Sequence, residues 1–337
     1  MNESLANRYR PHKFDQVCSQ ESVIRILQNQ IDTKTFKQAY IFTGPAGCGK
    51  TTCARILANE MNNGVGEPIE IDAASNNSVD NIRQISDQAR MQSLDSEYKV
   101  YILDEVHMLS GGAWAAMLKL IEEPPAKTIF ILCTTDVQKV PNTILSRCQR
   151  FDFSRISEQI IAERLLYVME QEHIRQSVSV AHYIASLSNG GMRTALSLLD
   201  KVLSYNCELT IENTVDALGT VSHDTMFDML THIVNCQDAY VISEIESEYQ
   251  AGKDLKQFVK SFMLFVLDVR KYQLTGTLKY TDIPEIYSEK MFAYAGRCED
   301  SVQIVLEALV KLNADIKYES NPRALIEASL ISIKLGD

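Results

Sequence analysis

Short apolar runs alternate with amphipathic segments over the first 155 residues. The runs predict buried strands at residues 39–42, 69–72, 99–105, 128–135 and 150–153. Helical spacing of apolar positions follows or precedes them at residues 52–61 and 79–91, and a further helix is expected to begin near Ser19 or Gln20. Strands that alternate with helices are typical of an α/β fold with a mostly parallel sheet covered on both faces.

After residue 156 the strand signal fades and helical periodicity continues to the end of the chain. The expected helices cover residues 160–172, 178–188, 192–205, 211–218, 222–235, 237–251, 254–274, 283–295 and 298–335, the last with a break near Asn321. We therefore predict three domains: an α/β domain over residues 1–155, a small helical domain over 156–207 and an all-α domain over 208–337.

Residues 44–51 read GPAGCGKT and match the phosphate-loop pattern G-x-x-x-x-G-K-[ST] at every position. The loop lies between a predicted strand and a predicted helix, so its backbone N–H groups would point at phosphate oxygens at a helix N-terminus. An ordinary glycine-rich turn is the alternative. We predict a nucleoside-triphosphate site in which Lys50 reaches the β- and γ-phosphates and Thr51 binds Mg²⁺. The residues expected to surround the phosphates are Gly44, Pro45, Ala46, Gly47, Cys48, Gly49, Lys50, Thr51 and Thr52.

Two further strands end in polar side chains. Asp104 and Glu105 follow the apolar run of residues 100–103, and Thr134 and Thr135 end the run that starts at residue 128. Ligands bind at the carboxyl ends of parallel strands. Asp104 is thus placed to hold Mg²⁺ through water, Glu105 to polarise the attacking water, and one threonine to read the γ-phosphate or to orient the water. A strand ending in two threonines before a turn is also common.

The segment of residues 7–17, NRYRPHKFDQV, precedes the first long helix. Pro11 excludes a regular helix there, so Tyr9 and Arg10 are expected in an extended turn. Such an aromatic and basic segment could cover an adenine ring. A simple strap over the core fits these residues equally well.

The composition of the chain bears on its cellular compartment and on its partners. No apolar run approaches the roughly 20 residues that span a bilayer, and the N-terminus lacks the apolar core of a secretory signal. Eight scattered cysteines without a C-x-x-C pair are expected to be small buried thiols, so we predict a cytoplasmic chain without disulfides. The net charge of −11 divides unevenly: residues 1–155 carry 17 Lys and Arg against 18 Asp and Glu, and the remainder 16 against 26. The acidic total argues against a general nucleic-acid coat but leaves a local DNA contact possible.

Seven segments in residues 8–200 together resemble one family. They read RYRPHKFDQV, GPAGCGKTT, EIDAASN, KVYILDEVHMLS, LKLIEEPP, TTDVQKVPNTILSRCQRF and GGMRTALSLLD. The chain resembles the AAA+ ATPases and, among them, the bacterial DNA polymerase III gamma/tau family of clamp-loader subunits. Residues 208–337 match more weakly, chiefly at ALGTV and NPRALIEASL. The resemblance implies an AAA+ domain, a helical lid and a helical collar through which subunits oligomerise.

The resemblance also implies a role for each matching residue. Asp104 is the carboxylate beside Mg²⁺ and Glu105 is the catalytic base. Thr135 is the polar sensor residue near the γ-phosphate, and Thr134 is the alternative for that role. Arg147 matches an arginine finger that acts in trans on the ATP of a neighbouring subunit, and Arg193 matches a second sensor from the lid. Residues expected to border the adenine are Tyr9, Arg10 and Val17. The expected cofactors are ATP and Mg²⁺. No zinc is expected, because residues 62–68 contain no cysteine where the family usually carries a zinc module.

The implied function is that of an ATPase motor in a sliding-clamp loader, part of a DNA polymerase III-type holoenzyme. Its expected partners are other clamp-loader subunits in a pentameric ring, a sliding clamp and primer-template DNA, with no membrane. The chain ends where the tau form continues, so a short form is expected. Two alternatives remain: another AAA+ DNA motor, which would unwind DNA without a clamp, and a scaffold subunit that binds nucleotide without hydrolysing it.

The resemblance to clamp loaders also implies DNA contacts, made by helix N-termini and basic side chains, and the candidates here lie before and in the helix of residues 79–91 and after the acidic strand. They are Asn76, Asn77, Ser78, Arg83 and Ser110. Such groups contact phosphate without reading base sequence. For Arg83, a solvated helix face is the alternative.

Overall fold

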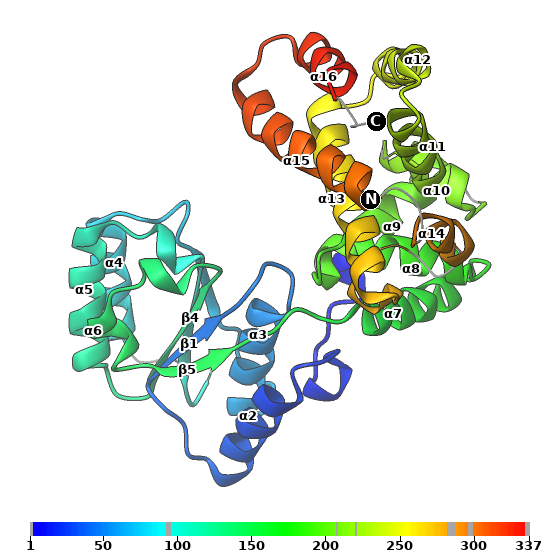
Figure 1. Ribbon diagram of the computed structural model, residues 1–337. Helices are drawn as coiled ribbons and strands as arrows, with labels where there is room; N and C mark the ends of the chain where they lie inside the picture. Colours follow the sequence, from blue (N-terminus) through cyan, green and yellow to red (C-terminus); the bar gives the residue numbers. More distant parts are fainter. Residues whose placement is uncertain are drawn as a thin grey trace. The chain divides into compact units, whose positions relative to one another are not determined.

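A computed structural model describes residues 3–91, 96–206, 208–219, 221–281, 283, 287–295 and 299–333. The chain divides into two compact units, Met1–Asp200 and Lys201–Asp337 (Figure 1). Both units are helical over much of their described length, and the five strands found among the described residues lie in the first. The predicted division into three domains is finer than this and stays a prediction.

The first unit is built on a parallel sheet with the strand order β2-β3-β4-β1-β5. The strands are β1 (Ala39–Thr43), β2 (Ile69–Asp72), β3 (Lys99–Asp104), β4 (Thr128–Thr134) and β5 (Gln149–Asp152). Every residue of β1 and β4 is buried, as expected for central strands covered on both faces. The apolar runs in the sequence therefore mark the strands correctly.

Alternate side chains of β1 show how both faces of the sheet are covered. Tyr40 and Phe42 pack with residues of α2 and α3, whereas Ala39 and Ile41 pack in a separate cluster with residues of α4, α5 and α6. In Figure 1, α2 and α3 lie on one side of the strands and α4, α5 and α6 on the other. The helices of this unit are α1 (Leu5–Arg8), α2 (Glu21–Thr33), α3 (Lys50–Met61), α4 (Val79–Ala89), α5 (Gly111–Glu122), α6 (Asn142–Leu145), α7 (Glu158–Gln171), α8 (Val178–Leu187) and α9 (Met192–Tyr205), which continues into the second unit.

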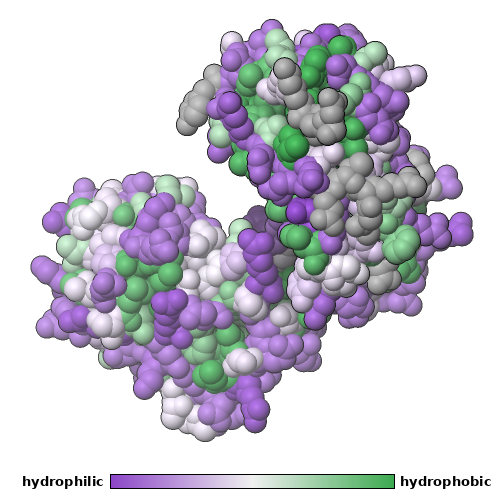
Figure 2. Space-filling model, viewed as in Figure 1, coloured by the Kyte–Doolittle hydropathy of each residue, from purple (hydrophilic) through white to green (hydrophobic). Residues whose placement is uncertain are grey.

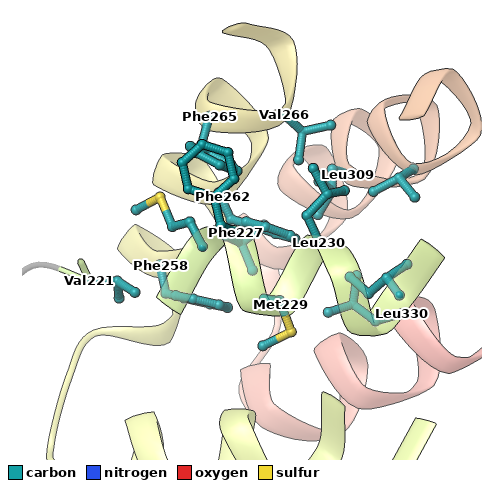
Figure 3. Close-up of a cluster of buried hydrophobic side chains, with 14 of the residues drawn as sticks. Val221, Phe227, Met229, Leu230, Phe258, Phe262, Phe265, Val266, Leu309 and Leu330 are labelled. Carbon is teal, nitrogen blue, oxygen red and sulfur yellow. The ribbon is translucent and has the colours of Figure 1, made fainter. Parts of the chain in front are cut away.

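The described part of the second unit is helical. Its helices are α10 (Ile211–Leu218), α11 (His223–Val234), α12 (Asp238–Gln250), α13 (Leu255–Thr275), α14 (Ser288–Ala295), α15 (Glu299–Asp315) and α16 (Pro322–Ile331). The long helix α13 packs against α11, α14, α15 and α16. Figure 3 shows the shared core, which contains Phe258, Phe262 and Phe265 of α13 together with Phe227 of α11. The Phe227 and Phe265 rings meet edge to face, with centroids 4.8 Å apart.

The predicted α/β fold class is confirmed: a domain with a parallel sheet is followed by helices in the described residues of the chain. On the face drawn in Figure 2, hydrophilic residues cover most of the surface and hydrophobic residues form separated patches. Among the helices of the described residues, none has both the length and the apolar character needed to cross a membrane. The large apolar side chains lie mainly in the cores of the two units.

Candidate functional site

The phosphate loop connects β1 to α3, and its backbone needs glycine at two positions for steric reasons. Gly44 has φ +149°, and a Cβ there would lie 2.3 Å from the carbonyl oxygen of Phe153. Gly47 has φ +74°, and a Cβ there would lie 3.0 Å from Cα of Gly191. The carbonyl of Gly47 also accepts a 3.0 Å hydrogen bond from the N–H of Met192. The loop therefore packs directly against the chain after β5 and the start of α9.

Lys50 and Thr51 begin α3, so the helix N-terminus faces the loop. The Lys50 side chain is only 6% exposed, and its Nζ donates to the carbonyl oxygens of Gly44 (2.8 Å) and Pro45 (2.7 Å). Thr51 Oγ1 donates to Oδ2 of Asp104 at 2.8 Å. The hydroxyl and the carboxylate that were predicted for Mg²⁺ thus lie together, and both offer the oxygen ligands that this ion prefers.

Glu105 has a left-handed backbone, with φ 49° and ψ 44°, directly after β3. Its Oε2 accepts hydrogen bonds from the N–H (3.3 Å) and the hydroxyl (3.0 Å) of Thr135. Nδ1 of His107 lies 3.2 Å from the same oxygen and 3.2 Å from Oγ1 of Thr134. Thr135 therefore contacts the candidate base directly, whereas Thr134 is linked to it through His107.

A pocket of about 540 Å³ lies over the phosphate loop, a volume within the range of small-molecule sites. Its walls include Tyr9, Arg10, Val17 and Arg193, which the sequence had predicted for the nucleotide. Residues 46–52, Asp104 and Glu105 also line it. The structure thus brings most of the predicted nucleotide residues to one pocket of the first unit, while Thr135 approaches it through its bonds to Glu105.

The N-terminal segment is fastened to the end of α7. Both oxygens of the Glu172 carboxylate accept from Arg8 Nη1, at 2.8 and 2.7 Å, and Oε1 also accepts from the Tyr9 hydroxyl. Arg164 Nη2 donates to the Tyr9 carbonyl at 3.2 Å. Desolvation and the bond to Glu172 raise the pKa of Tyr9 to about 12. Partial burial in the pocket lowers the pKa of Arg10. The segment is a strap and a pocket wall at once, so the two alternatives drawn from its sequence are compatible.

Arg147 lies outside this pocket, after the short helix α6. Its Nη2 is 2.8 Å from Oε1 of Glu122, and its Nη1 donates to the carbonyl of Thr143 at 2.9 Å. The side chain is 42% exposed. The guanidinium is thus paired with Glu122, partly exposed to solvent, and does not line the nucleotide pocket of its own chain.

The candidate DNA residues fall into two groups. Ser78 and Ser110 are the N-caps of α4 and α5, and Ser110 N–H donates to the carbonyl of Asn77 at 3.1 Å. Because α4 and α5 pack against each other, these two helix N-termini lie side by side. Asn76 and Arg83 are bonded elsewhere: Asn76 Nδ2 donates to the Asp72 carbonyl, and Arg83 pairs with Asp80 in an exposed i,i+3 ion pair.

Two family models match most of the chain between them. The model described as DNA polymerase III, delta subunit matches residues 67–157, and the model described as DNA polymerase III subunits gamma and tau domain III matches residues 209–335. DNA polymerase III subunit tau of Bacillus subtilis is 36% identical over 362 residues, covering 98% of this chain and 63% of that protein. The gamma subunit of Buchnera aphidicola is 29% identical, with 98% of both chains covered. Over almost its whole length the chain is similar to the bacterial DNA polymerase III gamma and tau subunits.

The family resemblance drawn from the sequence is thereby confirmed. The chain spans less than two thirds of the B. subtilis tau subunit and 49% of the gamma/tau subunit of Mycoplasma genitalium. Among solved structures, the RuvB Holliday junction branch migration motor of Thermotoga maritima matches with a TM-score of 0.54 and 17% identity, covering 67% of this chain and 79% of that one. At this identity the likeness to RuvB shows the AAA+ fold and carries no activity over.

The cysteines differ in part from expectation. Cys48, Cys53 and Cys133 are buried as predicted, and burial raises the pKa of the Cys53 thiol to about 12. Cys236 is exposed, so the prediction of buried thiols is wrong there; it has φ 55° in the turn between α11 and α12, where the chain reverses at the surface. The remaining cysteines are Cys18 and Cys148, which are half-buried, and Cys207 and Cys298, which lie outside the described residues. The described residues hold no group of three or more His, Cys, Asp or Glu side chains arranged for a metal ion.

Gln20 is a site residue that the sequence did not reveal. Its side chain is 6% exposed and lies just before α2. Nε2 donates to the carbonyl of Ser154 at 2.7 Å and lies 3.4 Å from the carbonyl of Cys48, while Oε1 accepts from Ser154 N–H at 3.1 Å. One amide thus fastens the chain after β5 beneath the phosphate loop. No motif signals this contact, because 134 residues separate its partners.

Proposed function

We propose that this chain is an ATP-hydrolysing motor subunit of a sliding-clamp loader. The observation that carries the proposal is the meeting of Lys50, Thr51, Asp104 and Glu105 at the carboxyl ends of β1 and β3. Similarity to gamma and tau subunits supports the assignment to DNA polymerase III, since these relatives are named as subunits of that polymerase. In this role the chain would work in the cytoplasm, where it would meet replicating DNA.

The proposed chemistry assigns a separate task to each side chain. Lys50 exchanges the carbonyls of Gly44 and Pro45 for the β- and γ-phosphates of ATP, while loop N–H groups hold the remaining phosphate oxygens. Thr51 and Asp104 would hold Mg²⁺, which neutralises charge on the transferred phosphoryl group. Glu105 accepts the proton of the water that attacks the γ-phosphorus, and ADP leaves. The pocket walls Tyr9, Arg10 and Val17 border the adenine. No zinc is part of the proposal.

The proposed control of hydrolysis lies in assembly. Arg147, open to solvent and outside its own pocket, would reach the ATP of the next subunit in a ring, which we propose to be pentameric. Arg193 would contact the ATP of its own subunit, and Thr135 would sense the γ-phosphate. An arginine supplied in trans is typically worth about 10³–10⁵ in rate, so hydrolysis would depend on subunit assembly.

The proposed partners are the other loader subunits, the clamp and primer-template DNA. The adjacent N-termini of α4 and α5, at Asn77, Ser78 and Ser110, are the surface we propose to face the DNA backbone, because N–H groups at helix ends bind phosphate. Arg83 on α4 and Asn76 in the turn before α4 would add further contacts to the DNA backbone. ATP binding would close the ring on clamp and DNA, and hydrolysis would release both.

Steady-state ATP turnover tests the proposal. The wild-type chain is compared with Arg147→Ala, alone and with primed DNA plus a sliding clamp. We expect DNA and clamp to stimulate the wild type, and Arg147→Ala to lower the stimulated rate by about 10³. Arg150→Ala is the matched control, since Arg150 is also exposed (45%) and paired with an acidic residue. Turnover that ignores DNA, clamp and Arg147 would refute the motor proposal. Turnover that survives Glu105→Gln would refute the assignment of the base.

A further inference from the structure

His107 belongs to the segment DEVHMLS but has no task in the proposed function. It lies in the 3-10 turn Val106–Met108 directly after β3, and its side chain is 13% exposed. Nδ1 is 3.2 Å from Oε2 of Glu105 and 3.2 Å from Oγ1 of Thr134. The imidazole therefore presents one nitrogen to two oxygens that come from the ends of neighbouring strands.

Thr134 gives this histidine a fixed support. Its side chain is fully buried at the end of β4, and its Oγ1 also accepts the N–H of Asp136 at 3.0 Å. Because β3 and β4 are paired in the sheet, the spacing between Thr134 and the turn that carries His107 is set by the strand register. The imidazole is thus held on a rigid element of the fold.

The carboxylate of Glu105 is held asymmetrically. Oε2 accepts from the N–H and the hydroxyl of Thr135 and lies 3.2 Å from Nδ1 of His107. Within the described residues, no hydrogen bond reaches Oε1. An oxygen surrounded by donors is poorly placed to take a further proton, so Oε1 is the atom available to a water molecule.

The backbone at Glu105 requires such support. Its φ of 49° is in the left-handed region, which is uncommon for residues other than glycine. Conformations of this kind persist where surrounding contacts hold them, and they are concentrated at functional sites. The contacts to Thr135 and His107 are the ones that hold the side chain of this residue.

We propose that His107 is a positioning residue for the catalytic carboxylate: its Nδ1–H binds Oε2 of Glu105 and leaves Oε1 to take the proton of the attacking water. This inference rests on the proposed function, because it assumes that Glu105 is the base. It also gives both threonines a task. Thr135 binds the carboxylate directly, and Thr134 fixes the histidine that binds it.

Two polar substitutions separate this role from simple packing. The amide nitrogen of His107→Asn can occupy the position of Nδ1, whereas that of His107→Gln extends to the position of Nε2. We expect His107→Gln to lower kcat for ATP by about 10- to 100-fold, the usual effect of losing an orienting partner. His107→Asn should stay within about threefold of the wild type, and KM for ATP should change little in both. A packing role would place both variants at equal activity.

A Glu105→Gln background supplies the second measurement. If His107 acts through Glu105, then His107→Gln adds no further loss of kcat once Glu105 is glutamine, because residues that act as a unit are not additive. Native Trp114 fluorescence verifies that each variant is folded. Equal kcat values for His107→Asn and His107→Gln would overturn the inference, and so would a full additional loss of kcat in the Glu105→Gln background. In either case ATP turnover by the wild-type chain would leave the proposed function intact. A wild-type chain without ATP turnover would overturn the proposed function itself, and this inference with it.

Discussion

Replacement of Gln20 by alanine should destabilise the first unit and weaken its nucleotide site. The side chain bridges the chain after β5 to the base of the phosphate loop through its bonds to Ser154 and its approach to Cys48. Alanine removes both the donor and the acceptor. The backbone N–H and carbonyl of Ser154 then lose their partner in a region that packs against Gly44 through Phe153.

The size of the effect follows from the two strong contacts. Each neutral hydrogen bond contributes about 0.5–1.5 kcal/mol net, and an unsatisfied buried group costs about 1–3 kcal/mol. Ser154 is exposed, so water replaces part of the loss. We expect the free energy of unfolding to fall by about 2 kcal/mol, which lowers Tm by about 4–8 °C for a unit of this size. Gln20→Glu should cost at least as much, because a carboxylate oxygen would face the Ser154 carbonyl.

The single tryptophan makes this measurement specific to one unit. Trp114 lies in α5 with 7% of its surface exposed, so its fluorescence reports unfolding of the first unit. Urea titrations of the wild type, Gln20→Ala and Gln20→Glu are followed by this signal, and binding of a fluorescent ATP analogue is measured in parallel. Gln28→Ala is the control, since Gln28 is exposed on α2 and should shift stability by no more than about 0.5 kcal/mol.

Two outcomes would refute the reasoning about Gln20. The first is a Gln20→Ala transition that coincides with that of Gln28→Ala, since the buried amide would then contribute nothing to the unit. The second is a loss of stability without any weakening of nucleotide binding, because the contact would then support the fold but not the loop. Both results are read from the same pair of titrations.

Two further predictions concern the second unit. Phe262→Ala should lower its free energy of unfolding by about 3–5 kcal/mol, because the ring is fully buried in the core drawn in Figure 3. Circular dichroism should show this loss, while the unfolding transition reported by Trp114 should not move. Leu264→Ala is the control, because Leu264 is 46% exposed on the same helix. An equal loss of stability in Leu264→Ala would contradict the prediction. Burial lowers the pKa of His223 to about 4. In the unfolded chain His223 takes up a proton near pH 6.5, whereas in the folded unit it does so only near pH 4. The free energy of unfolding is therefore highest above pH 6.5 and falls by up to about 3 kcal/mol as the pH is lowered toward 4. In His223→Gln this part of the pH dependence should disappear; an unchanged pH profile would show that the histidine is not the cause.

Local sequence pattern predicts the elements of the first unit well. The apolar runs at β1, β3 and β4 mark strands that are buried on both faces, and their ends agree with the prediction to within one or two residues. Helix α5 (Gly111–Glu122) was not predicted, although its segment LKLIEEPP was recognised. The alanines and glycines at its start give a weak periodic signal, so the pattern of apolar residues did not predict this helix.

Residues of the site were predictable where their geometry is local. The phosphate loop needs only its own glycines and the first turn of α3, so its pattern identifies Lys50 and Thr51 without reference to the rest of the chain. The bond from Gln20 to Ser154 and the contact of His107 with Thr134 depend on which strands are neighbours. Neither can be derived from spacing along the chain, because pairing of strands is a property of the whole sheet.

Strand order also explains why separate motifs form one site. Along the chain the loop of residues 44–51 comes first, the acids at 104 and 105 second and the threonines at 134 and 135 third. In the sheet, however, β4 lies between β1 and β3, so the two threonines end the strand between the loop and the acids. That position allows Thr135 to bind Glu105 while β4 pairs with the strand that carries the phosphate loop. A group that is proposed to sense phosphate and to position the base would lie between them, and the order β3-β4-β1 provides that position.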